Sequence, residues 1–136
     1  MITENHVSFK TAKLLKEKGF DSDTDYIYYY YESDGEWCFE RFFHWDKFDD
    51  GKMLHAPTQQ GALTWLTEIF GIYIDVRPDP NSTGFYLSFY KNNGSEWIQA
   101  LEDDGAVYNG KTIEKEIFPR FENAMEYGLV CCLKKL

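Results

Sequence analysis

Apolar residues recur at helical spacing in two early segments of the chain. One segment follows Ser8 and stops at Gly19, and the other follows Thr58 and stops at Gly71. Serine and threonine side chains cap helix N-termini, and glycine takes the left-handed conformation that ends many helices. The pattern predicts a short first helix and a longer second helix.

A third apolar stripe follows Pro119 and has the longest helical periodicity in the sequence. Its members are spaced so that all of them fall on one side of a helix. They are Phe121, Ala124, Met125, Gly128, Leu129, Cys132, Leu133 and Leu136. This segment is therefore expected to form an amphipathic helix that buries the stripe.

Strand-forming residues and period-two alternation predict five strands. Residues 26–31 and 36–43 flank Asp34-Gly35, a dipeptide typical of hairpin turns, so these two runs are expected to pair with each other. Three later runs alternate apolar and polar side chains or follow a turn signal. They cover residues 72–76, 85–90 and 97–101.

These elements follow one another in the order α-β-β-α-β-β-β-α. Hairpin-sized connections favour antiparallel pairing, and helices that cover one face of an antiparallel sheet make a two-layer sandwich. We therefore expect an α+β fold with an antiparallel sheet of about five strands and three helices. The length of 136 residues suits one domain, residues 1–136.

Negative charge and aromatic side chains are concentrated in one block of the chain. The formal net charge is −9, and residues 21–50 contain ten acidic residues but two basic ones. Eleven aromatic residues lie in the same block. Binding along a phosphate backbone requires a cationic face, so direct binding to nucleic acid is not expected.

Three segments of the sequence are similar to one group of proteins. The segments VSFKTAKLLKEKGF, APTQQGALTWLTEIFGIYIDVRPD and RFENAMEYGLVCCLKKL resemble short uncharacterised proteins encoded by phages and prophages of gut bacteria. The resemblance implies a mobile-element origin and carries no assigned activity. Its matching residues are helix caps, helix ends and apolar positions, so it points to a fold and to no site.

Cysteine content and the apolar profile bear on cellular location. The sequence contains three cysteines, Cys38, Cys131 and Cys132. An odd number with two adjacent members does not suit the disulfide framework of a secreted protein. No signal-peptide core lies near Met1, and no apolar run approaches the roughly 18 residues of a membrane-spanning helix. We expect a cytoplasmic protein without membrane contact.

The sequence contains no motif for a cofactor, a metal or a defined catalytic mechanism. His44, His55 and Cys38 lack the close pairs that typify zinc sites, and no Gly-rich nucleotide loop or Gly-x-Ser-x-Gly elbow occurs. We therefore predict no catalytic, cofactor-binding or metal-binding residues. One enzymatic alternative stays open, namely a hydrolase without a motif, built around His44 with Asp46 or Asp49.

The acidic, aromatic block favours a binding role. Alternation places Trp37 and Phe39 on one face of a strand, and rings bordered by carboxylates suit a surface that binds a basic protein. The predicted surface includes Tyr28, Tyr30, Trp37, His44, Trp45 and Asp46. We predict an accessory protein that binds a protein partner through this surface, with self-association left open. A further alternative is that the acids mimic nucleic acid and inhibit a host enzyme.

Overall fold

The computed structural model of the chain describes residues 5–43, 51–92, 94, 97–102, 107–108, 111–112 and 117–136. All three predicted helices form, with α1 at Phe9–Glu17, α2 at Gln59–Phe70 and α3 at Phe121–Lys135. The strands are β1 (Tyr26–Tyr31), β2 (Glu36–Arg41), β3 (Met53–His55), β4 (Ile72–Pro78), β5 (Phe85–Asn92), β6 (Trp97–Glu102), β7 (Val107–Tyr108) and β8 (Lys111–Thr112). None of the helices in the described ranges is long and apolar enough to cross a membrane.

The ends of α1 and α2 form as predicted. Ser8 Oγ accepts a hydrogen bond from Thr11 N at 3.3 Å, and Thr58 Oγ1 accepts one from Gly61 N at 3.0 Å. These bonds satisfy backbone donors that have no partner within the first turn of a helix. Gly71 follows α2 with a φ of 67°, a left-handed conformation that disfavours residues with a Cβ. The chain can therefore turn directly from α2 into β4.

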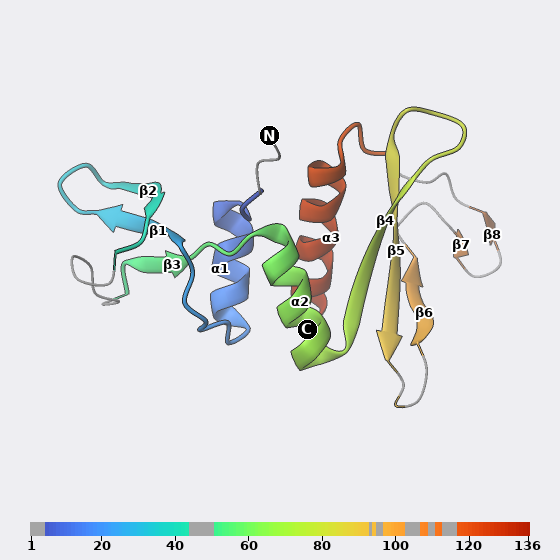
Figure 1. The fold of residues 1–136 in the computed structure, drawn as a ribbon, viewed down its shortest axis with the longest axis horizontal. Helices are drawn as coiled ribbons and strands as arrows, with labels where there is room; N and C mark the ends of the chain where they lie inside the picture. Colours follow the sequence, from blue (N-terminus) through green and yellow to red (C-terminus); the bar gives the residue numbers. More distant parts are fainter. Residues whose placement is uncertain are drawn as a thin grey trace.

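The strands do not form the single sheet that we expected. β1 pairs with both β2 and β3 to give the order β2-β1-β3, and a separate sheet has the order β4-β5-β6. β7 and β8 form a two-stranded ribbon, and all these pairings are antiparallel. The α+β class is confirmed. One sheet of about five strands is not confirmed. β3, which has no clear sequence pattern, adds to β1, and the helices separate this sheet from β4, β5 and β6 (Figure 1).

The three helices stand between the two three-stranded sheets (Figure 1). α1 contacts β3 and α3, while α2 and α3 both contact β4. The described elements thus form three layers in place of the expected two. The β1–β2 hairpin lies at one end of the molecule, on the far side of the helices from β4 and β5 (Figure 1).

The core lies where α2 and α3 meet β4 and β5. The predicted α3 stripe is buried except for Phe121 and Leu136 at its two ends. Gly128, in the middle of the stripe, allows a close approach of helix and sheet, because a Cβ there would lie 3.0 Å from Ile74 Cγ2. Leu15 of α1 and Leu66 of α2 are fully buried in the same cluster.

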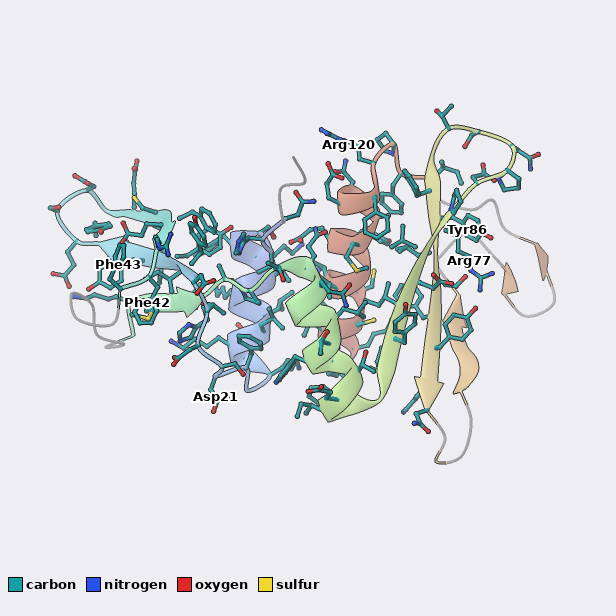
Figure 2. All side chains as sticks on the ribbon, in the orientation of Figure 1. Asp21, Phe42, Phe43, Arg77, Tyr86 and Arg120 are labelled. Carbon is teal, nitrogen blue, oxygen red and sulfur yellow. The ribbon has the colours of Figure 1, made fainter. Side chains whose placement is uncertain are left out.

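The outer face of the β4–β5 pair is polar and aromatic. Arg77 Nε donates a hydrogen bond to Asp75 Oδ2 at 2.6 Å, and Arg77 Nη2 donates one to Tyr90 Oη at 2.6 Å. Arg77 and Tyr86 point away from the helices (Figure 2). Alternation along β4 thus separates this face from Ile74, which is buried against α3.

Candidate functional site

The β1–β2 hairpin carries a row of aromatic side chains on one face. In its register Tyr30 pairs with Trp37 and Tyr28 pairs with Phe39, and paired residues of an antiparallel ladder point to the same face. Tyr26 shares this face because it lies two residues before Tyr28 on the same strand. We call this surface the aromatic face, and its members are Tyr26, Tyr28, Tyr30, Trp37 and Phe39.

The rings of the aromatic face contact one another along the hairpin. Tyr26 and Phe39 are stacked, with ring centroids 5.1 Å apart and an interplanar angle of 7°. The ring centroids of Phe39 and Tyr28 are 5.2 Å apart, and those of Tyr30 and Trp37 are 5.3 Å apart. Each such ring pair contributes roughly 0.5–1.5 kcal/mol to stability, in addition to the free energy gained by burying the surface of the rings. Trp37 and Phe39 nevertheless remain 37% and 45% exposed.

Two residues that precede the hairpin in the sequence extend the aromatic face. Phe9 of α1 contacts Tyr28 and Trp37, with ring centroids 5.6 and 5.2 Å apart. The His6 ring contacts Tyr26 at 4.8 Å. The aromatic face therefore packs against the start of α1, and these contacts restrict the movement of its partly exposed rings.

Tyr28 connects the aromatic face to the core. Its hydroxyl donates a hydrogen bond to Val7 O at 2.8 Å. Burial raises the pKa of Tyr28, and the negative charge of Glu126 raises it further. The neutral phenol is therefore favoured, and it keeps the proton that the bond to Val7 requires.

Exposed acidic side chains lie on the hairpin and on the segment that leads into it. They are Asp21, Asp23, Asp25, Glu32, Asp34 and Glu36. Glu32 forms an ion pair with Lys52 of the loop before β3. Arg41 is the one basic residue among residues 21–43, and its guanidinium carbon lies 5.7 Å from the centroid of the Phe43 ring. The electrostatic potential around the hairpin is therefore expected to be negative.

The structure places half of the predicted binding residues together. Tyr28, Tyr30 and Trp37 lie on the aromatic face. The remaining three, His44, Trp45 and Asp46, fall outside the described residues. Asp49 falls outside them too, so the alternative of a hydrolase built on His44 stays a prediction.

Four residues of this surface were not among the predicted binding residues. Period-two alternation along the hairpin would have identified Tyr26 and Phe39, because each lies two positions from a predicted residue. His6 and Phe9 had no such signal, since their contacts with the hairpin depend on how α1 packs against β1.

The described histidines and acids do not assemble a metal centre. Within the part of the chain that the structure describes, no group of three or more His, Cys, Asp or Glu is placed to hold a metal ion. His55 on β3 instead has its Nδ1 3.1 Å from Thr24 Oγ1, and its ring contacts Phe42 at 5.8 Å. These contacts fix the imidazole between β3 and the segments that flank the hairpin.

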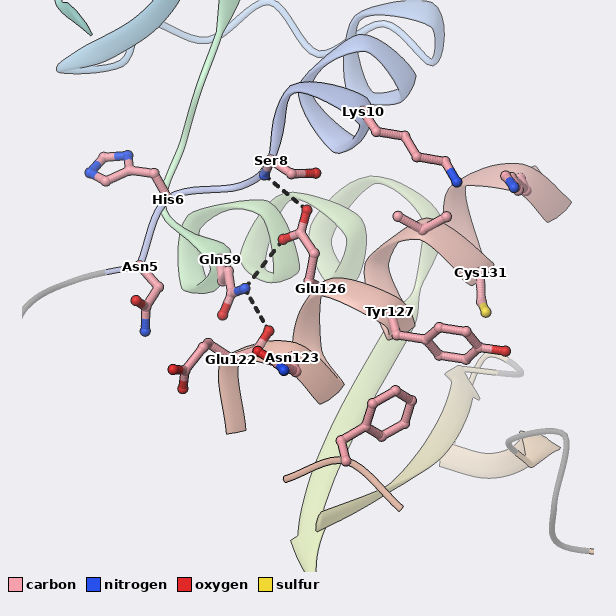
Figure 3. A pocket seen from close by; sticks show the side chains of 13 residues that line it. Asn5, His6, Ser8, Lys10, Gln59, Glu122, Asn123, Glu126, Tyr127 and Cys131 are labelled. Atoms are coloured by element: carbon pink, nitrogen blue, oxygen red, sulfur yellow. Dashed lines mark hydrogen bonds between the residues drawn. The ribbon is translucent and has the colours of Figure 1, made fainter. Parts of the chain in front are cut away.

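A groove of about 760 Å³ lies between the N-terminal segment and α3 (Figure 3). Its lining includes the apolar side chains of Phe118, Tyr127 and Val130. Lys10 and Lys134 also line it, and Figure 3 shows Lys10 extending over α3. The groove is thus mixed in character, with an apolar part and charged groups from two helices.

Glu126 has a structural role at this groove. Its Oε1 accepts a hydrogen bond from Ser8 N at 2.8 Å, and its Oε2 accepts one from Gln59 Nε2 at 3.2 Å (Figure 3). Gln59 Nε2 also donates to Glu122 O at 2.9 Å. These bonds join α3 to Ser8, the N-cap residue of α1, and to Gln59, the first residue of α2. The carboxylate of Glu126 therefore has a structural role in the groove.

No protein-family model matches this chain, and neither a curated protein nor a solved structure is significantly similar to it. The resemblance to phage-encoded proteins therefore stays a prediction. What the fold and the site define is an α+β protein with a partly exposed aromatic hairpin face among acidic residues.

Proposed function

We propose that this protein binds another protein through its aromatic face, and that the partner presents a basic surface. The observation that carries the proposal is the exposure of Trp37 and Phe39, at 37% and 45%, within a row of contacting rings. Exposed aromatic rings with a rigid backing are typical anchors of protein interfaces, because they bury a large area at a small cost in conformational entropy. Phe9 supplies that backing here.

The charge of the partner follows from the acids around the rings. The described segment 21–43 contains seven acidic residues and one basic residue. Charges at the rim of an interface mainly accelerate association with an oppositely charged partner and exclude partners of like charge. We therefore infer a division of roles in which the rings supply most of the affinity and the acids select a cationic partner.

The resemblance to phage-encoded proteins makes a protein of the bacterial host the first partner to test. The tagged full chain would be incubated with an extract of a gut bacterium, and captured proteins would be quantified by mass spectrometry. The test variant is the double substitution Trp37→Ala and Phe39→Ala. Ile69→Ala is the matched control, because Ile69 is 61% exposed and lies on α2, away from the hairpin.

We expect the wild type and Ile69→Ala to recover equal amounts of a basic protein. The double variant should recover at least about tenfold less of it. Capture should also weaken at about 1 M salt, where charges are screened beyond about 3 Å. Equal recovery by the double variant, with its fold verified by circular dichroism, would contradict the proposal.

A second set of substitutions separates this proposal from mimicry of nucleic acid. Glu32→Gln, Asp34→Asn and Glu36→Gln together remove three exposed negative charges from the hairpin and leave its rings in place. Ring-mediated binding predicts slower association with the partner and a smaller loss of affinity than the ring substitutions cause. If the charge variant abolishes capture while the ring variant does not, the acids are the recognised feature and our proposal is wrong.

A further inference from the structure

The hairpin has an outer edge as well as an aromatic face. β2 is the terminal strand of its sheet, and no strand in the described part of the chain pairs with its second edge. Figure 1 shows the turn of the hairpin reaching away from α1, while the Phe9 ring of α1 contacts Trp37 on the aromatic face of β2. The backbone groups along the outer edge determine what could bind there.

Hydrogen bonds on either side of β1 establish which backbone groups face which neighbour. Tyr30 N donates to Lys52 O at 2.9 Å, and Ala56 N donates to Tyr26 O at 3.0 Å. In an antiparallel ladder, alternate residues of a strand direct both their N–H and C=O groups to the same side. The even-numbered residues of β1 therefore face β3, and its odd-numbered residues face β2.

The same alternation determines the outward groups of β2. Phe42 N donates to Asp25 O at 2.8 Å, so the even-numbered residues at this end of β2 direct their backbone groups toward β1. The odd-numbered residues direct theirs to the outer edge. These outward residues are Trp37, Phe39 and Arg41, and the side chains of all three point to the side of the aromatic face, because Arg41 pairs with Tyr26.

The edge of β2 has only some of the usual protections against pairing. Exposed edge strands are commonly blocked by proline, by a bulge or by charged side chains. β2 has the sequence EWCFER, which contains no proline, and its six residues pair with β1 in an unbroken register. Its charged residues are Glu36, Glu40 and Arg41, and only Arg41 points to the side of the aromatic face. A straight strand with three outward N–H groups is the geometry to which an extended peptide can add.

We propose that the outer edge of β2 binds an extended segment of the basic partner as an additional antiparallel strand. This inference rests on the proposed function and specifies how the aromatic face would be used. Residues of the added strand opposite Trp37 and Phe39 would lie on the aromatic face, so apolar side chains fit there.

The other face of the added strand is specified by charge. Residues opposite Glu36 and Glu40 would lie on the face away from the rings, so lysine or arginine fits there. Glu40 is held in position by the Tyr31 hydroxyl, which donates to its two carboxylate oxygens at 2.6 and 2.9 Å. The recognised segment is therefore one in which apolar and basic residues alternate.

A second copy of this chain is a poorer occupant of the same edge. Pairing two β2 strands would bring together two hairpins that each carry the acidic residues of segment 21–43. Like charges opposite one another destabilise a strand pair, whereas a basic segment gains from the same acids. Charge complementarity thus favours a different protein.

The experiment uses the full chain and a synthetic eight-residue peptide of alternating valine and lysine. Two modified peptides carry N-methyl groups, one on the valine amides and one on the lysine amides. In an added antiparallel strand, the valines opposite Trp37 and Phe39 direct their N–H groups to β2, and the lysine N–H groups point away. Binding would be measured by fluorescence anisotropy of a labelled peptide.

We expect N-methylation of the valines to weaken binding at least about tenfold, because it removes several interstrand hydrogen bonds, and N-methylation of the lysines to weaken it less than about threefold. Amide hydrogen exchange at Trp37, Phe39 and Arg41 should slow when the unmodified peptide binds. Equal effects of the two modified peptides, whether both bind or both fail, would overturn the proposal of an added strand.

The controls separate this proposal from the proposed function. If Trp37→Ala with Phe39→Ala weakens peptide binding but the two N-methylated peptides bind alike, the aromatic face binds a basic partner without strand addition. If neither the ring variant nor the N-methylated peptides change binding, both proposals are wrong. Sedimentation of the free chain as a dimer that the peptide does not dissociate would assign the edge to a second copy and also overturn the proposal.

Discussion

Thr11 and Glu126 lie 115 positions apart in the sequence, and the Thr11 hydroxyl donates a hydrogen bond to Glu126 Oε1 at 2.5 Å. The same oxygen accepts the Ser8 amide, so one carboxylate of α3 satisfies two donors at the start of α1. Thr11 is fully buried and Gln59, a third donor to Glu126, is 8% exposed. A negative charge in this position also interacts favourably with the N-terminal end of the α1 dipole.

Glu126→Ala is expected to lower the free energy of unfolding by about 3 kcal/mol. The substitution removes the carboxylate that accepts from the Thr11 hydroxyl and from the Ser8 amide, and it removes one of the two acceptors of Gln59 Nε2. A buried donor that loses its partner costs about 1–3 kcal/mol. Urea unfolding followed by circular dichroism would measure the change. Glu68→Ala, on an exposed position of α2, is the control and should change stability by less than about 0.5 kcal/mol.

Gly128→Leu is expected to destabilise the protein by about 3 kcal/mol. The Cβ of any residue at this position would lie 3.0 Å from Ile74 Cγ2 and 3.5 Å from both methyl groups of Leu87, so a larger side chain must separate α3 from the sheet. Thermal unfolding would show the loss as a lower Tm. Unchanged stability would mean that α3 does not approach β4 as closely as described.

A double-mutant cycle tests whether the contact with Ile74 causes the destabilisation by a larger residue at position 128. Gly128→Ala adds one methyl group, whose clash with Ile74 opposes the roughly 1 kcal/mol that alanine gains over glycine in a helix. In an Ile74→Ala background the clash is absent, so the same substitution should then stabilise the protein relative to that background. Equal effects in the two backgrounds would show that the Ile74 contact is not responsible.

Local signals in the sequence were sufficient for the elements whose partners are close along the chain. Ser8 and Thr58 cap their helices through donors three residues away, and the turn at Asp34-Gly35 joins β1 to β2 directly. Such features depend on a few neighbouring residues. Their prediction therefore needs no knowledge of the tertiary fold.

Features that depend on distant partners could not be predicted in the same way. β3 has three residues, too few for an alternating pattern, and its pairing with β1 joins segments more than twenty residues apart. Glu126 is one of two acidic residues on α3, and an acidic residue on an amphipathic helix normally indicates its solvent-facing side. His6 and Phe9 contact the aromatic face because α1 packs beside the hairpin, and the hairpin sequence alone does not predict that packing.

Cys132 is expected to be unreactive in the folded protein. Burial raises the pKa of its thiol to about 12, with the nearby Cys131 adding to the effect and Lys135 opposing it. The reactive thiolate is therefore scarce at pH 8. In a Cys131→Ser variant, mass spectrometry after mild alkylation should find Cys38 modified well before Cys132, because Cys38 is half-buried. Similar modification rates for the two cysteines would contradict the buried position of Cys132.

Tyr28→Phe is expected to lower the free energy of unfolding by about 1 kcal/mol near neutral pH, since it removes the hydrogen bond to Val7 O. The pKa of Tyr28 is raised in the folded protein, so the unfolded chain releases this proton first as the pH increases. The contribution of Tyr28 is thus complete below the ordinary tyrosine pKa of about 10 and is lost as the pH rises through the folded pKa.

The difference in stability between the wild type and Tyr28→Phe should therefore shrink above about pH 10, because the wild type alone carries the titrating Tyr28 hydroxyl. Urea unfolding of both proteins between about pH 8 and 11 would measure it, and the remaining tyrosines cancel because both chains contain them. Tyr73→Phe, which alters a 43% exposed ring on β4, is the matched control. A difference that stays constant or widens with pH would show that the phenol is not held neutral by burial.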